Sequence, residues 1–100
     1  MATKIRGSSG NVFRDLGFPS AEAENLKLRA DLMIELTRLI RARRLTQARA
    51  ASLLGVSQPR ISDLMRGKID RFTVDTLVAM LGHAGIHVRL TLSPRSRAAA

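Results

Sequence analysis

The chain contains no cysteine, which excludes disulfide bridges, thiolate metal sites and a cysteine nucleophile. Tryptophan and tyrosine are also missing, and with three phenylalanines the core has to be mainly aliphatic. The longest apolar run is five residues, Leu77 to Leu81, whereas a membrane-spanning helix needs about 20. The basic first residues are not followed by the hydrophobic block of a signal peptide. We therefore expect a cytoplasmic protein without a membrane partner.

Acidic residues are also few: 8 Asp and Glu face 17 Lys and Arg, which gives a net charge of +9 over 100 residues. This length corresponds to one domain, and 45% hydrophobic residues suffice for a core. The positive charge is spread along the chain, so it belongs to the folded body. It favours an anionic partner, with nucleic acid as the first candidate. An anionic membrane surface is the alternative, but the chain lacks an obvious basic amphipathic anchor.

A core pattern extends over residues 11–92 and is missing from both ends. Residues 1–10 are predicted to be a flexible segment, and residues 93–100 a flexible basic tail. Within the domain, the periodicity predicts a short helical turn at 11–16 and a long helix at 21–43, with Ser20 as its N-cap.

Three further helices are bounded by explicit start and stop signals. Each follows a Ser or Thr that can cap it and ends at a glycine: 47–54 between Thr46 and Gly55, 58–66 between Ser57 and Gly67, and 74–84 between Thr73 and Gly85. Residues 86–92 then alternate between apolar and polar, as in a half-buried strand. We expect an all-α domain of five helices with one C-terminal strand.

A lone strand leaves a row of backbone groups without hydrogen-bond partners. Within the chain only Thr3 to Arg6 offers a partner, and a weak one. We therefore expect residues 86–92 to pair with the same strand of a second copy across a two-fold axis. The alternative is addition to a sheet of a different protein.

Residues 47–66 have the pattern of a helix-turn-helix, in which two short helices meet at a tight turn. Ala51 is small where the helices approach, and Gly55 lies where the turn requires a positive φ. Leu54, Val56, Ile61 and Leu64 are apolar where the pair must pack, whereas Ser57, Gln58, Arg60, Ser62 and Asp63 fall on the other side of the second helix. This pattern in a basic chain predicts binding to double-stranded DNA.

Four short motifs follow one another here: Leu45-Thr46-Gln47-Ala48, Leu54-Gly55-Val56-Ser57-Gln58, Ile61-Ser62-Asp63-Leu64 and Arg66-Gly67-Lys68. They resemble the XRE-type helix-turn-helix family, which includes phage repressors and Cro. Together with Asn11 to Phe18, the long helix, Pro59-Arg60, Phe72 and the terminal strand, they are also similar to the HigA-type antitoxins over about residues 11–92. That resemblance implies a homodimer that neutralises a small ribonuclease toxin and represses its own operon.

The resemblance also implies that the second motif helix lies in the DNA major groove. Gln58 is then the main base-reading residue, since an amide pairs bidentately with adenine. Arg60 would reach guanine or a phosphate, and Ser62 and Asp63 would contribute. Asp63 has the alternatives of accepting from cytosine or of pairing with Arg60 or Arg66.

Backbone phosphates would be held by five further residues: Thr46, Gln47, Ser57, Arg66 and Lys68. Thr46 and Ser57 can act simply as helix caps, and Arg66 and Lys68 as ordinary solvated surface. A dimer would place its two recognition helices about 34 Å apart, which predicts a palindromic operator.

Residues 1–35 exceed a minimal DNA-binding unit and favour the antitoxin over a stand-alone or phage-type regulator, which is the alternative. Four acidic residues could face a basic toxin or could simply be solvated: Glu22, Glu24, Asp31 and Glu35. The net charge of +9 argues against the antitoxin, because a basic toxin would repel it.

A catalytic set is not apparent in the sequence. His83 and His87 are the only histidines, and we expect them at the surface or at a helix end rather than on a metal. A glycine-rich phosphate loop is also missing. We therefore expect no enzymatic activity, no metal and no cofactor.

Overall fold

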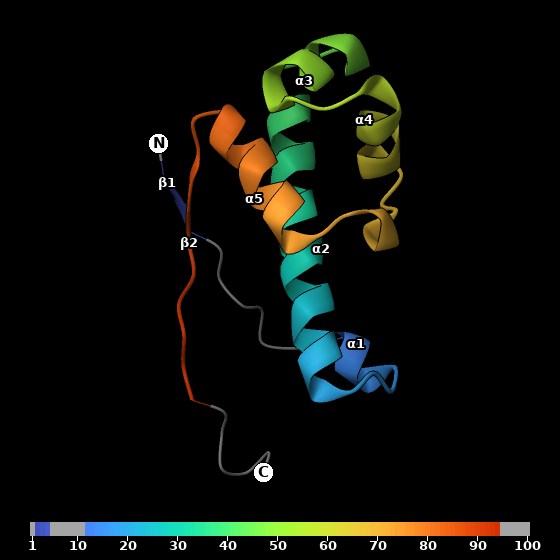
Figure 1. Ribbon diagram of the computed structural model, residues 1–100, viewed down its shortest axis with the longest axis vertical. Helices are drawn as coiled ribbons and strands as arrows, with labels where there is room; N and C mark the ends of the chain where they lie inside the picture. Colours follow the sequence, from blue (N-terminus) through green and yellow to red (C-terminus); the bar gives the residue numbers. More distant parts are fainter. Residues whose placement is uncertain (1, 5–11, 95–100) are drawn as a thin grey trace.

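The computed structural model describes residues 2–4 and 12–94 (Figure 1). In chain order these form β1 (Ala2–Lys4), α1 (Val12–Asp15), α2 (Ser20–Ala42), α3 (Gln47–Leu54), α4 (Gln58–Met65), the 3₁₀ turn η1 (Ile69–Arg71), α5 (Val74–His83) and β2 (His87–Arg89). The prediction of a mainly helical domain with five α-helices and a short C-terminal strand is confirmed for this part of the chain. The turn η1 was not predicted. None of the described helices is long and apolar enough to cross a membrane.

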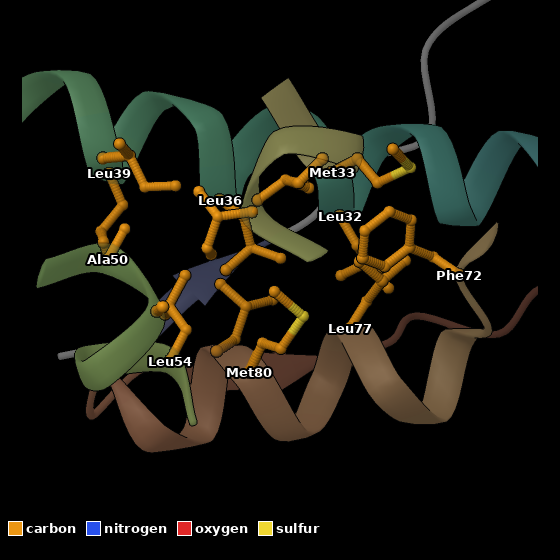
Figure 2. Close-up of a cluster of buried hydrophobic side chains, with 14 residues drawn as sticks. Leu32, Met33, Leu36, Leu39, Ala50, Leu54, Phe72, Leu77 and Met80 are labelled. Carbon is orange, nitrogen blue, oxygen red and sulfur yellow. The ribbon is translucent and has the colours of Figure 1, made fainter. Parts of the chain in front are cut away.

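Helix α2 forms the axis of the molecule: α1 lies beside its first turns, and α3, α4 and α5 surround its second half (Figure 1). The stripe Leu32, Leu36 and Ile40 faces the core, as helical spacing requires. Figure 2 shows Leu54 of α3, Leu77 and Met80 of α5, and Phe72 converging on this stripe. Burial of each large apolar side chain contributes about 1.5–3 kcal/mol, so this cluster holds the short helices in place.

The predicted caps form at three of four helices. The hydroxyl oxygens of Thr46, Ser57 and Thr73 accept backbone N–H groups at 3.1, 3.3 and 3.1 Å. Ser20 is not a cap: it is the first residue of α2, and Pro19 holds the N-cap position with φ −55° and ψ 149°. Proline suits that place because its ring fixes φ and it needs no N–H partner.

Gly55 ends α3 with a φ of +71°, which confirms the positive φ expected of the turn. A Cβ at this position would also lie 3.0 Å from Nε2 of His83 in the last turn of α5. The backbone conformation therefore favours glycine here, and a larger residue would in addition have to displace the exposed histidine ring by a few tenths of an ångström.

The terminal strand is three residues long rather than seven, and within the chain it pairs with β1, which overlaps the weak candidate segment Thr3 to Arg6. The two strands are parallel, with Thr3 opposite Val88. Residues 2–4 form a strand within the segment 1–10 that was predicted to be flexible, whereas residues 1, 5–11 and 95–100, which include most of the predicted basic tail, lie outside the described chain. Leu90 and Leu92 continue the alternating pattern but are exposed, because α5 and the three-residue β1 give them no surface to cover.

Candidate nucleic-acid interface

Helices α3 and α4 form the helix-turn-helix through apolar residues on their facing sides. Ala51 and Leu54 of α3 are buried, and so are Ile61 and Leu64 of α4. Val56, in the turn, packs against the same cluster. Because Ile61 and Leu64 fix one side of α4 against the body, the residues on its opposite side face solvent.

That solvent side carries Gln58, Ser62 and Arg66, which we call the outer face of α4. Their spacing of four residues places them above one another, and Gln58 and Arg66 are exposed while Ser62 is half-buried. An amide, a hydroxyl and a guanidinium in one row can pair with base edges and with phosphate oxygens. The outer face thus brings together three of the predicted DNA-contacting residues.

The predicted base-reading residues Arg60 and Asp63 do not lie on the outer face. Nη1 of Arg60 donates to the backbone oxygen of Arg71 at 2.7 Å, and its guanidinium stands 5.5 Å from the ring centre of Phe72. Asp63 pairs at 3.5 Å with Arg71, neither Arg60 nor Arg66 being its partner. The reason is η1, which turns the chain back and brings Arg71 alongside α4. We call Arg60, Asp63 and Arg71 the bracing set.

The predicted phosphate-binding residues lie around the outer face rather than in one cluster. Thr46 and Gln47 are exposed at the start of α3, and Ser57 precedes α4. Lys68 is half-buried between α4 and η1. The capping role of Thr46 and Ser57 is directly visible, and it leaves the hydroxyls exposed beside helix N-termini, where an anion is favoured.

The sequence analysis did not identify two residues that hold the interface in place, Arg71 and Arg29. Nη1 of Arg29 on α2 donates to the backbone oxygens of Ile69 and Phe72, both at 3.2 Å, so it ties η1 to α2. Its position in the sequence could have indicated this role, because residue 29 falls in the apolar stripe between Leu26 and Met33. A cation in such a stripe needs buried acceptors, and carbonyl groups supply them.

The acidic residues of α2 are largely satisfied within the chain. Glu24 lies 3.9 Å from Arg14, Asp31 2.8 Å from Lys27, and Glu35 3.1 Å from Arg38. The predicted acidic face for a basic toxin is therefore weaker than the four carboxylates alone indicate. In residues 2–4 and 12–94, no three potential metal-ligating side chains come together.

The comparisons with known proteins agree with this geometry. Residues 12–93 match a helix-turn-helix domain family. A solved structure described as an XRE-family transcriptional regulator superposes with a TM-score of 0.70 and 32% sequence identity, covering 79% of this chain and 89% of the other. No curated protein gives a significant match. The XRE-type prediction is confirmed, and the narrower HigA type is not.

Proposed function

The chain belongs to the helix-turn-helix domain family and is an XRE-type DNA-binding regulator, and on this premise we propose that it is a sequence-specific transcriptional repressor. The observation that supports this most is the outer face of α4. Gln58, Ser62 and Arg66 form one solvent-facing row on a helix whose other side is locked into the core. Such a helix enters the major groove without rearrangement.

In the proposed complex, Gln58 reads adenine and Ser62 adds a second contact to a base edge. The residues around the outer face hold the DNA backbone: Thr46, Gln47, Ser57, Arg66 and Lys68. Arg60 and Asp63 keep α4 in place rather than reading bases. The net charge of +9 supplies the sequence-independent attraction to DNA.

We further propose a homodimer on a palindromic operator. Strand β1 occupies one edge of β2, so a second copy has the other edge available for antiparallel pairing. Val88→Pro should then abolish the dimer mass in light scattering, because proline removes a ladder hydrogen bond. An unchanged dimer mass, in a variant shown to be folded by circular dichroism, would exclude the strand as the basis of dimerisation.

The finer proposal is an antitoxin, a cytoplasmic protein without catalytic activity of its own that neutralises a small ribonuclease toxin. Its support is the resemblance of residues 11–92 to HigA-type antitoxins. A stand-alone regulator is the second candidate, and two observations favour it. Three carboxylates of α2 have partners within the chain, and the matched family domain itself begins at residue 12, so α1 and α2 are not an addition to it.

The deciding experiment is an affinity pull-down of the tagged chain from its own host, with nuclease added, followed by mass spectrometry. The antitoxin proposal expects a stoichiometric small protein whose expression alone stops growth. Co-expression of the chain should restore growth. The matched control is Gln58→Ala, which should weaken operator binding and still restore growth, because Gln58 is proposed as a base-reading residue and not as a toxin contact.

A chain that elutes only with itself and still binds a palindrome in its own promoter would establish the stand-alone regulator. A chain that binds no DNA sequence preferentially, in selection from a random duplex library, would overturn the repressor itself. Toxin capture and DNA sequence preference are measured separately, so each proposal can fail alone.

A further inference from the structure

One side of α2 lines a groove of about 570 Å³. Phe13 of α1 lies at the groove, and Leu64, Met65 and Ile69 from the end of α4 and from η1 also line it. Ile34 of α2, also in the lining, is 50% exposed. The volume is in the range of small-molecule sites, and the described residues leave this isoleucine without the apolar cover that its neighbours have.

The groove is polarised along α2. Met33 and Ile34 provide apolar surface nearer the start of the helix, and Arg38 and Arg41 lie one and two turns further along. These arginines are the charged residues among the described lining, and no carboxylate accompanies them there. Arg38 forms an ion pair with Glu35, whereas Arg41 has no ion pair or side-chain hydrogen bond with any described residue.

We propose that this groove binds an amphipathic carboxylate, with its alkyl chain along Ile34 and Met33 and its head group at Arg41 and Arg38. Two features lead to this ligand class. An apolar trough favours an alkyl chain in proportion to the area it covers, and a guanidinium pairs with a carboxylate through two parallel hydrogen bonds. The cationic end repels an amphiphile with an ammonium head group. An alcohol head group is neutral and would leave the charge of Arg41 without an ion-pair partner.

This site goes beyond DNA binding, and it lies beside the helix that performs it. Leu64 and Met65 are in the last turn of α4, one residue before Arg66 on the outer face. A bound chain would therefore touch the recognition helix from its core side. The basic surface of a second copy is a poor occupant of this groove, because the groove itself has a cationic end.

The methionines provide a direct test. Met33 and Met65 line the groove, whereas Met80 is buried in the core and does not. Dodecanoate, added below its micelle concentration to protein with ¹³C-labelled methionine methyl groups, should shift the signals of Met33 and Met65 and leave Met80 in place. The shifts should fit a single binding site per chain, with a Kd below about 1 mM. Decanoate should bind up to about fourfold more weakly for each methylene that it lacks.

Two pairs of variants distinguish binding in the groove from non-specific attraction to positive charge or to exposed apolar surface. Arg41→Gln should weaken dodecanoate binding about tenfold, as loss of a charge-assisted pair implies, and Arg43→Gln, which removes a neighbouring charge outside the groove, should not. Ile34→Gln should weaken it several-fold, and Val78→Gln, at an exposed apolar residue of α5, should not. Both members of each pair are solvent-exposed, so all four variants should fold.

Three results would overturn the proposal. Equal affinity for dodecyltrimethylammonium would remove the role of the arginines, and equal shifts at Met80 would indicate binding outside the groove. Absence of any shift with dodecanoate would show that the groove takes no alkyl carboxylate. If a purified protein partner shifted Met33 and Met65 where dodecanoate did not, the groove would be a protein-docking surface instead.

Discussion

Helix α4 has two polar sides that look alike in the sequence and differ in the structure. On the outer face, Gln58 and Arg66 are exposed, and neither side chain forms an ion pair or a hydrogen bond with a described residue. On the other side, Arg60 and Asp63 belong to the bracing set with Arg71. The comparison shows that α4 uses part of its polar surface to hold its own position. Position matters here because reading a base requires the donor and acceptor atoms to be placed to within a few tenths of an ångström.

The bracing set acts through the segment that follows α4. Arg60 and Arg29 both donate to backbone oxygens of residues 69–72, one from α4 and the other from α2. Phe72, buried in the core, lies under the guanidinium of Arg60. The helix, the turn and the core are thus joined by one short stretch of chain, and disturbing that stretch should affect α4 more than any change on its outer face.

The largest expected effect is on Phe72, which is 1% exposed. Phe72→Ala should lower the free energy of unfolding by about 3–5 kcal/mol, because it leaves a cavity and removes the ring under Arg60. Urea denaturation measures this change, with Val78→Ala as the exposed control, expected to stay within about 0.5 kcal/mol. A loss below about 1 kcal/mol would show that the 69–72 segment does not anchor α4.

Gln58→Ala probes the outer face. It should weaken binding to the selected operator by about 1–3 kcal/mol and relax the preference at one base position. Stability should change little because the side chain is exposed. Fluorescence anisotropy with the operator and its single-base variants measures both effects. If the base preference stayed intact, another element would be reading the sequence.

Arg60→Met probes the bracing set. The variant loses the hydrogen bond to Arg71 and the contact of the charge with Phe72, so unfolding should become easier by about 1–2 kcal/mol. The base preference should stay the same. Arg49→Met, on the exposed side of α3, is the matched control for loss of one charge. A changed preference at a single base pair would show that Arg60 leaves Arg71 in the complex and reads guanine, as its position in the sequence suggests.

Local signals explain why the helices were predictable. The capping hydroxyls of Thr46, Ser57 and Thr73 and the positive φ of Gly55 depend on residues within four positions along the chain. The same holds for the core faces of α3 and α4, whose spacing is set by the helix itself. The proposed DNA-facing role of Gln58 rests on that spacing together with the family resemblance.

The relationships that sequence reasoning missed join residues far apart in the chain. Arg29 meets carbonyls 40 and 43 residues later. The pairing of β1 with β2, which joins opposite ends of the chain, was expected only as the weaker alternative. Asp63 has three arginines within eight positions, at 60, 66 and 71, and the selection of Arg71 depends on the unpredicted turn η1. Which arginine folds back and which stays outside is therefore decided by tertiary packing, and no local pattern carries that information.

The smallest expected effect concerns Lys68, at the boundary between the outer face and η1. Lys68→Ala should weaken binding to all DNA sequences by about the same factor, because a phosphate contact carries no base information. It should also reduce the slope of log affinity against log salt by roughly one, the contribution of one released counterion. Gln47→Ala should likewise weaken all sequences equally but leave the slope unchanged, since it removes no charge. Lys27→Ala is the control, because that ammonium is paired with Asp31 on α2 at 2.8 Å. An unchanged slope in the Lys68 variant would place this lysine with the bracing set, as part of the support for α4 rather than of its contact with DNA.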